Sequence, residues 1–156
     1  MKRYINYLVI VIIIVLLDLL SKAWADNVLQ PLGSMEIIPG FFNLTYVQNT
    51  GGAWGLLAGN MLIFIIIGIV AIFGFIYYYL KHSSDRLTQI ASFMMLAGAI
   101  GNFIDRIVFS YVRDMFDFII FGYDFPVFNI ADISLVLGCG LLLISVILEI
   151  RDESNN

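Results

Sequence analysis

The stretch GAIGNFIDRIVFSYVRDMFDF, residues 98–118, sets six charged or amide side chains in very apolar surroundings. Such a cluster is unusual in a chain of 156 residues that is 61% hydrophobic and only 13% charged. Polar groups near hydrocarbon cost free energy unless they are paired or used, so the cluster indicates a function. Its members are Asn102, Asp105, Arg106, Arg113, Asp114 and Asp117.

The composition around this stretch predicts an integral membrane protein. The mean hydropathy is +0.95, and the chain has too few charges to cover the surface of a soluble domain of this size. The net charge of -4 and the lack of a basic stripe argue against nucleic acid as a partner.

Four apolar segments are each close to the roughly 20 residues that cross a bilayer as a helix. Helices are required because lipid cannot satisfy free backbone groups. We therefore expect an all-α membrane protein with four transmembrane helices, forming a single domain over residues 1–156. The spans are expected at about 4–22, 61–80, 87–106 and 128–149.

The first segment also resembles a secretory signal peptide. Basic residues precede its apolar run, and Ala23-Trp24-Ala25 follows it like a cleavage site. However, Asp18 and Lys22 interrupt the end of the run, and three further spans follow. We expect a retained helix on which Asp18 and Lys22, four positions apart, can pair.

The distribution of Lys and Arg predicts that both termini are cytoplasmic. The inner side would then carry Lys2, Arg3, Lys81, Arg86 and Arg151, and the outer side Lys22, Arg106 and Arg113. Extracytoplasmic loops are expected at about 25–60 and 107–127. The first is too long for a bare connection, and the alternation in Phe42–Tyr46 predicts a small β-rich region lying on the membrane.

This topology places the unusual polar residues at one depth, near the outer surface of the membrane. A single charge at a helix end is often an anchor, but anchors are mainly Lys and Arg, whereas this set is mainly Asp and Asn. The set comprises Asp18, Lys22, Asn49, Thr50, Gly51, Asn102, Asp105, Arg106, Asp114, Asp117, Asn129 and Asp132.

Carboxylates are the members of this set best suited to catalysis. Cys139 lies inside an apolar run, and His82, the only histidine, lies in a basic loop on the other side. Ser21 and Lys22 are adjacent on a helix and so do not face each other. Two carboxylates that share a site hold one proton, so one can activate water while the other polarises a carbonyl. The pattern does not choose between Asp105, Asp114, Asp117, Asp124 and Asp132.

Five motifs carry a resemblance to a known family along nearly the whole chain. They are DLLSKAW (18–24), QNTGGAWG (48–55), GAIGNFIDR (98–106), VRDMFDF (112–118) and FNIADIS (128–134). With these motifs in this order, the chain resembles the lipoprotein signal peptidases, the signal peptidase II family.

The resemblance implies an aspartic endopeptidase of the bacterial cytoplasmic membrane, with its active site near the extracytoplasmic face. It would cleave the signal peptide from a prolipoprotein, before a cysteine that carries a diacylglyceryl group. By motif position, Asp114 and Asp132 are the catalytic pair. The supporting residues are Asp18, Lys22, Asn49, Gly51, Asn102, Arg106, Asn129 and Ala131, with Asp105 in a structural role.

The same resemblance gives further expectations about binding. The partners are a lipid-modified prolipoprotein and membrane lipid, with no metal or cofactor, and the protein is expected to be a monomer. Asn102 and Arg106, one helical turn apart, are expected to hold the substrate backbone or lipid head group. The outer loop, with Asn49, Gly51 and Trp54, is expected to clamp the substrate.

Four positions depart from the usual family pattern. Gly52 stands where Ala is usual, Met115 where Phe is usual, and Ile133 where Ser is usual. Arg113 replaces an apolar residue and would lower the pKa of Asp114 if it faced that carboxyl. None of the four departures removes a carboxylate, so the expected reaction is unchanged and only the expected pH dependence is affected, by Arg113.

A small proton or ion transporter is the main alternative. Transporters place ionisable groups near the bilayer midplane, often within internal repeats. Here the ionisable groups lie near one surface, and the sequence has no repeat. A structural or assembly protein, the other alternative, would need no paired carboxylates.

Overall fold

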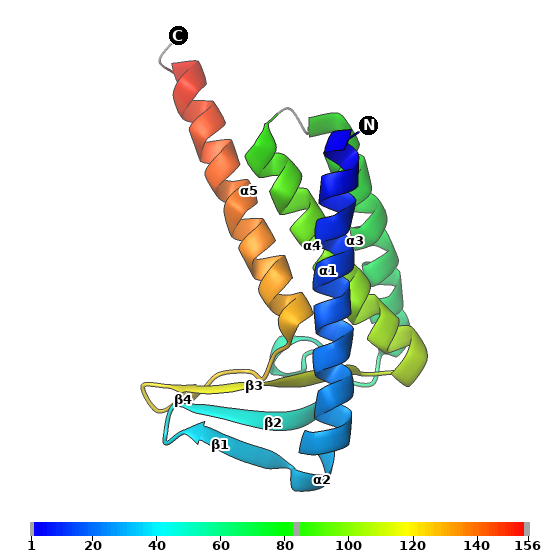
Figure 1. Cartoon of the computed structure of the whole chain (residues 1–156), viewed down its shortest axis with the longest axis vertical. Coiled ribbons are helices and arrows are strands. Elements are labelled where there is room, and N and C mark those ends of the chain that lie inside the picture. The colour runs from blue at the N-terminus through cyan, green and yellow to red at the C-terminus, as the bar shows by residue number, and fades with distance from the viewer. Residues whose placement is uncertain (1, 83–84, 155–156) are drawn as a thin grey trace.

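The structure, a computed structural model, describes residues 2–82 and 85–154. Long helices rise from a small sheet at one end, and both chain termini lie at the opposite end (Figure 1). Within the described residues, four helices are long and apolar enough to cross a membrane, as the sequence predicted. They are α1 (Lys2–Trp24), α3 (Met61–His82), α4 (Arg86–Phe109) and α5 (Ile130–Ser154).

The first helix is longer than the sequence indicated. Where an end near residue 22 was expected, helical structure continues through a π-helical turn, η1 (Ala25–Leu29), into α2 (Gln30–Leu32). The helix stops at Gly33, whose φ of 77° costs little without a Cβ, and the Gly33 N–H bonds the Leu29 carbonyl at 2.7 Å. Asp26 therefore belongs to the helix rather than to a loop.

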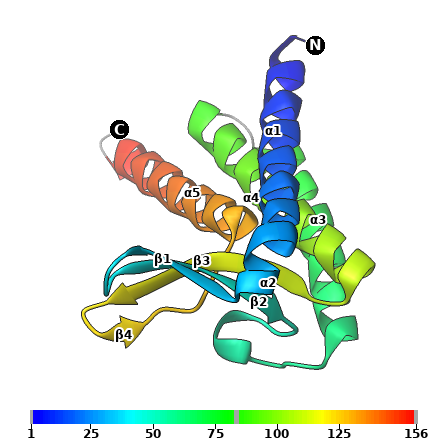
Figure 2. The ribbon, with the colours of Figure 1, turned by 60° about the horizontal axis from the view of Figure 1, so that its bottom comes forward.

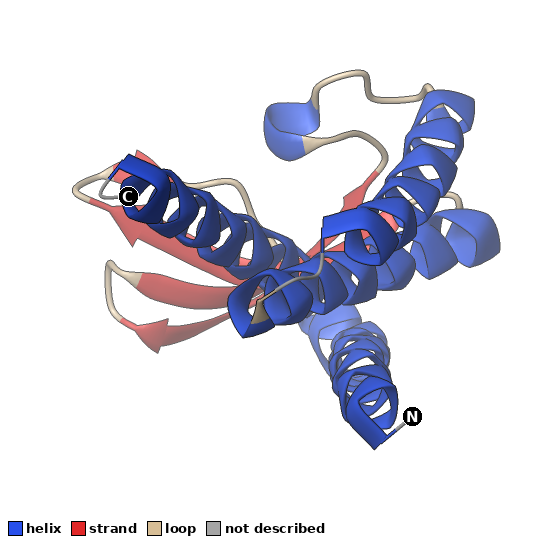
Figure 3. Ribbon diagram, turned by 90° about the horizontal axis from the view of Figure 1, so that it is seen from above, coloured by secondary structure: helices blue, strands red, loops and turns tan. Residues whose placement is uncertain are grey.

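Helix α4 is the centre of the helical part and contacts α1, α3 and α5. Seen from above, the other long helices fan out from it (Figure 3). Glycines allow close approach, because a Cβ at Gly138 would lie 2.9 Å from the Ala91 carbonyl oxygen. A Cβ at Gly101 would lie 2.6 Å from Oδ2 of Asp18. The start of α5 is thereby held against both α4 and α1.

The sheet combines residues from both of the expected loops. Its strands are antiparallel in the order β1 (Ser34–Ile38), β2 (Phe42–Asn49), β3 (Val112–Ile120) and β4 (Tyr123–Asp124). The sheet lies across the ends of α1 and α5, with the loop from β2 to α3 beside it (Figure 2). The sequence did not predict strand β3. Its first four residues, Val112–Met115, are all buried, so apolar and polar residues do not alternate there as they do in a strand with one exposed face.

Candidate active site

The first turn of α5 fixes the carboxylate of Asp132. Asn129 precedes the helix, and its Oδ1 accepts the backbone N–H of Asp132 at 3.0 Å. In return, Oδ2 of Asp132 accepts the backbone N–H of Asn129 at 3.1 Å. This reciprocal pair is a capping box, which explains the N-x-x-D spacing physically. Asp18 adds a bond from α1, accepting the Ala131 N–H at 2.9 Å.

Asp114 lies on β3 and is only 1% exposed. Its Oδ1 accepts Nδ2 of Asn129 at 2.6 Å, and its Oδ2 accepts Nδ2 of Asn49 at 2.9 Å. Asn49 is itself fixed at the end of β2, because its Oδ1 accepts the Gly51 N–H at 2.9 Å. The end of β2 and the cap of α5 therefore hold one oxygen each of the same carboxyl group.

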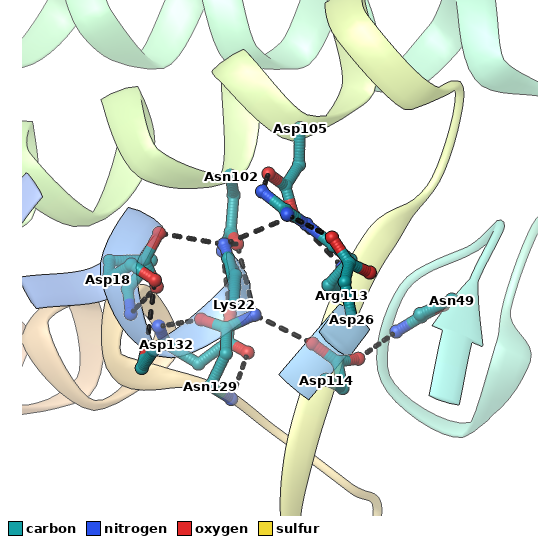
Figure 4. Close-up of polar contacts among 12 residues, drawn as sticks. Asp18, Lys22, Asp26, Asn49, Asn102, Asp105, Arg113, Asp114, Asn129 and Asp132 are labelled. Atoms are coloured by element: carbon teal, nitrogen blue, oxygen red, sulfur yellow. Dashed lines mark hydrogen bonds and ion pairs between the residues drawn. The ribbon is translucent and has the colours of Figure 1, made fainter. Parts of the chain in front are cut away.

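Two amide side chains connect Asp114 with Asp132 (Figure 4). Besides its bond to Asp114, Nδ2 of Asn129 donates to Oδ1 of Asn102 at 3.1 Å. The Nδ2 of Asn102 donates to Oδ1 of Asp132 at 2.7 Å. The amide of Asn102 is thus bonded at both ends to protein groups, and Asn102 also lines the cavity that holds the two carboxylates. The expected contact of Asn102 with the substrate stays a prediction.

The environment of Asp114 favours its protonated form. Burial, followed by the negative charge of Asp132, raises the pKa of Asp114 from 3.8 to about 7, although the bonds from Asn49 and Asn129 oppose the rise. The guanidinium of Arg113 bonds Asp105 and Asp26 rather than Asp114. Arg113 was expected to lower the pKa of Asp114 only if it faced that carboxyl group, and it does not face it.

A row of alternating charges lies behind the two carboxylates. Lys22 pairs with Asp18 at 2.8 Å, as the sequence predicted, and with Asp105 at 3.5 Å. Arg113 continues the row, pairing with Asp105 at 2.7 Å and with Asp26. The sequence did not point to Asp26, because its place on the helix depends on the unforeseen extension of α1.

Asp114 and Asp132 line one cavity of about 510 Å³. Apolar side chains of α5 and of the segment before it make up much of its wall: Phe125, Phe128, Ile133, Leu135, Val136 and Leu137. Val136 and Leu137 are also exposed on the outside of α5, so this wall reaches the surface that would face lipid. A smaller cavity of about 280 Å³, lined largely by residues 47–55, also includes Asp114.

Arg106 lines the larger of the two cavities. Its Nη2 lies 3.5 Å from the Gly51 carbonyl oxygen, and its guanidinium stacks on Phe64, 4.9 Å from the ring centroid. In the described part of the chain, its buried Nε has no hydrogen-bond partner. A Cβ at Gly51 would lie 2.7 Å from the Leu56 carbonyl oxygen, so the loop facing Arg106 needs glycine there.

A hydrogen bond joins the loop between β2 and α3 to β4. Trp54, in the loop between β2 and α3, donates from Nε1 to the hydroxyl of Tyr123 on β4 at 2.7 Å. Trp54 also lines the cavity. The sequence singled out Trp54 but gave no signal for Tyr123 or Phe64, because no motif connects such distant residues.

The five carboxylates among which the sequence pattern did not choose lie in different surroundings. Asp114 and Asp132 share the cavity, whereas Asp105 is buried behind it under Lys22 and Arg113. Asp117 accepts the Thr45 hydroxyl at 2.6 Å and does not line the cavity. Asp124 is exposed in β4.

Comparisons with known proteins show what the whole chain is similar to. A family model described as signal peptidase (SPase) II matches residues 10–148. The lipoprotein signal peptidase of Staphylococcus aureus strains JH9 and Newman is 41% identical over 149 residues, covering 95% of this chain and 90% of the relative. A bacterial membrane enzyme solved by the in meso method has a TM-score of 0.87 and 39% identity, over 97% of this chain and 91% of that one. A second such structure has a TM-score of 0.82 and 39% identity, over 90% and 92%.

Proposed function

The chain belongs to the signal peptidase II family, and we propose that Asp114 and Asp132 are the aspartic pair that carries out its reaction. The protein is a bacterial membrane protease that processes lipoprotein precursors. The observation that carries the proposal is the bridge of Asn102 and Asn129 between two carboxyl groups on one cavity.

The proposed reaction needs one proton on the carboxyl pair. With a pKa of about 7, Asp114 is the member that holds the proton and donates a hydrogen bond to the scissile carbonyl. Asp132 accepts a proton from the attacking water and gives it to the leaving amine as the tetrahedral intermediate collapses, so the pair ends with the single proton it began with. Because the two groups interact, their apparent pKa values belong to the pair.

The cavity supports a pose for the substrate. The diacylglyceryl chains lie along the apolar wall of α5, which reaches the outer surface at Val136 and Leu137. The peptide passes Asp114 into the smaller cavity beneath residues 47–55. Arg106 binds a backbone carbonyl or the lipid head group, because its Nε is unpaired among the described residues.

We assign both termini to the cytoplasm and the sheet to the extracytoplasmic side. Both termini lie at the end of the molecule opposite the sheet, as this topology requires (Figure 1). The side chains of Lys2 and Arg3, on which the sequence argument partly depended, lie outside the described residues. In this orientation the carboxyl pair lies near the outer leaflet, and the protein acts as a monomer on prolipoproteins and lipid.

The loop around Trp54 closes over the bound substrate in this proposal. Its bond to Tyr123 joins it to the sheet, so the two segments together cover the scissile bond and limit the entry of water. Replacing Tyr123 by Phe removes this bond alone and is expected to raise KM with little change in protein stability.

A cleavage assay with matched precursors tests the function. Purified protein is given a diacylglyceryl-modified precursor and the same precursor without lipid, and Asp114→Asn and Asp132→Asn variants are run beside the wild type. We expect cleavage of the lipidated precursor by the wild type alone. Cleavage by either folded variant would refute the pair, and altered ion flux with normal cleavage would favour a transporter.

A further inference from the structure

Lys22 is a buried cation that the proposed cleavage step does not use directly. Its side chain is 0% exposed, at the outer end of α1. Its Nζ lies 2.8 Å from Oδ2 of Asp18, 3.2 Å from Oδ1 of Asn102 and 3.5 Å from Oδ2 of Asp105. Burying a charge costs much free energy unless its donors are satisfied, and here oxygens from α1 and α4 surround the ammonium group.

The first link from Lys22 leads to Asp132. Because the cation faces Oδ1 of Asn102, the amide of Asn102 cannot rotate to present its NH₂ group there. The Nδ2 of Asn102 is therefore directed at Oδ1 of Asp132, which it reaches at 2.7 Å. Without the cation, the two orientations of this amide would be closer in energy.

The second link leads to Asp114. The same Oδ2 of Asp105 that faces Lys22 accepts the backbone N–H of Arg113 at 3.0 Å. Oδ1 of Asp105 accepts the Arg113 guanidinium at 2.7 Å. Arg113 directly precedes Asp114, so Asp105 sets the position of β3 where the catalytic carboxyl leaves the strand.

We propose that Lys22 is a positioning residue that fixes both catalytic carboxylates, Asp132 through Asn102 and Asp114 through Asp105. The inference rests on the proposed function, because it takes Asp114 and Asp132 as the reacting pair. Because the Lys22 ammonium group contacts both Asn102 and Asp105, one cation fixes the positions of the two carboxyl groups relative to each other. The pair belongs to different elements, β3 and α5, and its members are not neighbours in the sequence.

A purely structural role for Lys22 predicts different kinetics. If the cation only neutralised Asp18 and Asp105, its removal would lower the amount of folded protein, and the molecules that fold would turn over normally. A positioning role predicts folded protein that binds the precursor normally and cleaves it slowly, since a displacement of about 1 Å can cost about a hundredfold in rate.

The test measures kcat and KM on the lipidated precursor for Lys22→Met, Asn102→Ala and the double variant. Ser145→Ala serves as the control, because it removes a buried hydrogen bond to Thr88, 2.8 Å long, toward the other ends of α4 and α5. We expect Lys22→Met to lower kcat about tenfold to a hundredfold with KM within about threefold of the wild type. The double variant should lose clearly less than the product of the two single losses, because both changes remove the link to Asp132 and only Lys22→Met also removes the link to Asp105.

Multiplying losses in the double variant, or a normal kcat in folded Lys22→Met, would overturn the inference. If Lys22→Met does not accumulate, Lys22→Gln replaces it, since an amide cannot satisfy Asp18, Asn102 and Asp105 together. Its kcat should fall at least about tenfold, and full activity would count against the proposal.

Asp114→Asn and Asp132→Asn are measured in parallel. Activity in these variants would contradict the catalytic pair itself, whereas their inactivity beside an active Lys22 variant would contradict only the role of Lys22.

Discussion

At the scale of single residues, Asn129 combines two tasks that the sequence motif does not separate. Its Oδ1 caps α5 by accepting the Asp132 N–H, and its Nδ2 holds both Asp114 and Asn102. The capping bond contributes to helix stability, and in the proposed mechanism the Nδ2 bonds position the reacting carboxyl group. A substitution that keeps one task and removes the other can therefore measure each.

Serine at position 129 should restore stability but not activity. Asn129→Ala loses the cap and is expected to destabilise the protein by about 1 kcal/mol. Asn129→Ser keeps an oxygen that can cap the helix, so its thermal unfolding should return close to that of the wild type. Neither variant has the NH₂ group that reaches Asp114, so both should lose at least about tenfold in kcat. Wild-type turnover by Asn129→Ser would show that the Nδ2 bonds are dispensable.

The raised pKa of Asp114 makes stability depend on pH. The folded state holds this proton up to a pKa of about 7, whereas an unfolded Asp releases it near 3.8. Between these values the folded state binds more protons, so the contribution of Asp114 falls as pH rises. We expect the wild type to lose thermal stability between about pH 4 and pH 7 relative to Asp114→Asn. Melting curves across this range measure it, and parallel pH dependences would contradict a raised pKa.

At the scale of elements, hydropathy predicted the four long helices because lipid-facing residues dominate them. The helical structure that continues from α1 to Leu32 was not predicted, because Asp26 and Asn27 break the apolar pattern. In the structure these two residues form hydrogen bonds with protein groups. Strand β3 escaped prediction for a related reason. Arg113 and Asp114 have separate buried partners, Asp105 and Asn129, and neither is visible from the local sequence.

The spacing of α4 from its neighbours should depend on Gly101. A Cβ there would lie 2.6 Å from Oδ2 of Asp18 and 3.1 Å from Cβ of Ala131. Gly101→Ala is expected to destabilise the protein by about 1–3 kcal/mol and to lower kcat, because Ala131 lies in the first turn of α5 and Asp18 accepts its backbone N–H. Gly140→Ala is the control, since a Cβ at that position meets nothing within 4 Å. Equal melting temperatures for the two variants would contradict this packing.

At the scale of the whole molecule, the site is assembled from residues that are far apart in the chain. Motif order predicted Asp114 and Asp132 as the pair, and the structure brings these two residues to one cavity. Their placement in one site depends on the sheet and on the packing of α1, α4 and α5 against one another. Local sequence patterns predict single segments and do not show which distant segments pack together. Tyr123 and Phe64 belong to no motif, so only the fold reveals them.

The proposed orientation predicts which ends of the molecule are accessible in cells. A cysteine at Phe121, at the fully exposed tip between β3 and β4, should react with a membrane-impermeant maleimide in intact spheroplasts. A cysteine at Lys81, at the far end of α3, should react only after permeabilisation. Both are made in a Cys139→Ala background. The reverse labelling pattern would place the sheet on the cytoplasmic side.

The most direct test of the central claim is the single-turnover cleavage rate of the lipidated precursor by Asp114→Asn, Asp132→Asn and the double variant, each verified as folded. If the two carboxyl groups act as one unit, each single variant should lose at least about 10³-fold, and the double variant should lose no more than the slower single variant. A folded single variant that keeps about a tenth of the wild-type rate, or a double variant in which the two losses multiply, would contradict the account.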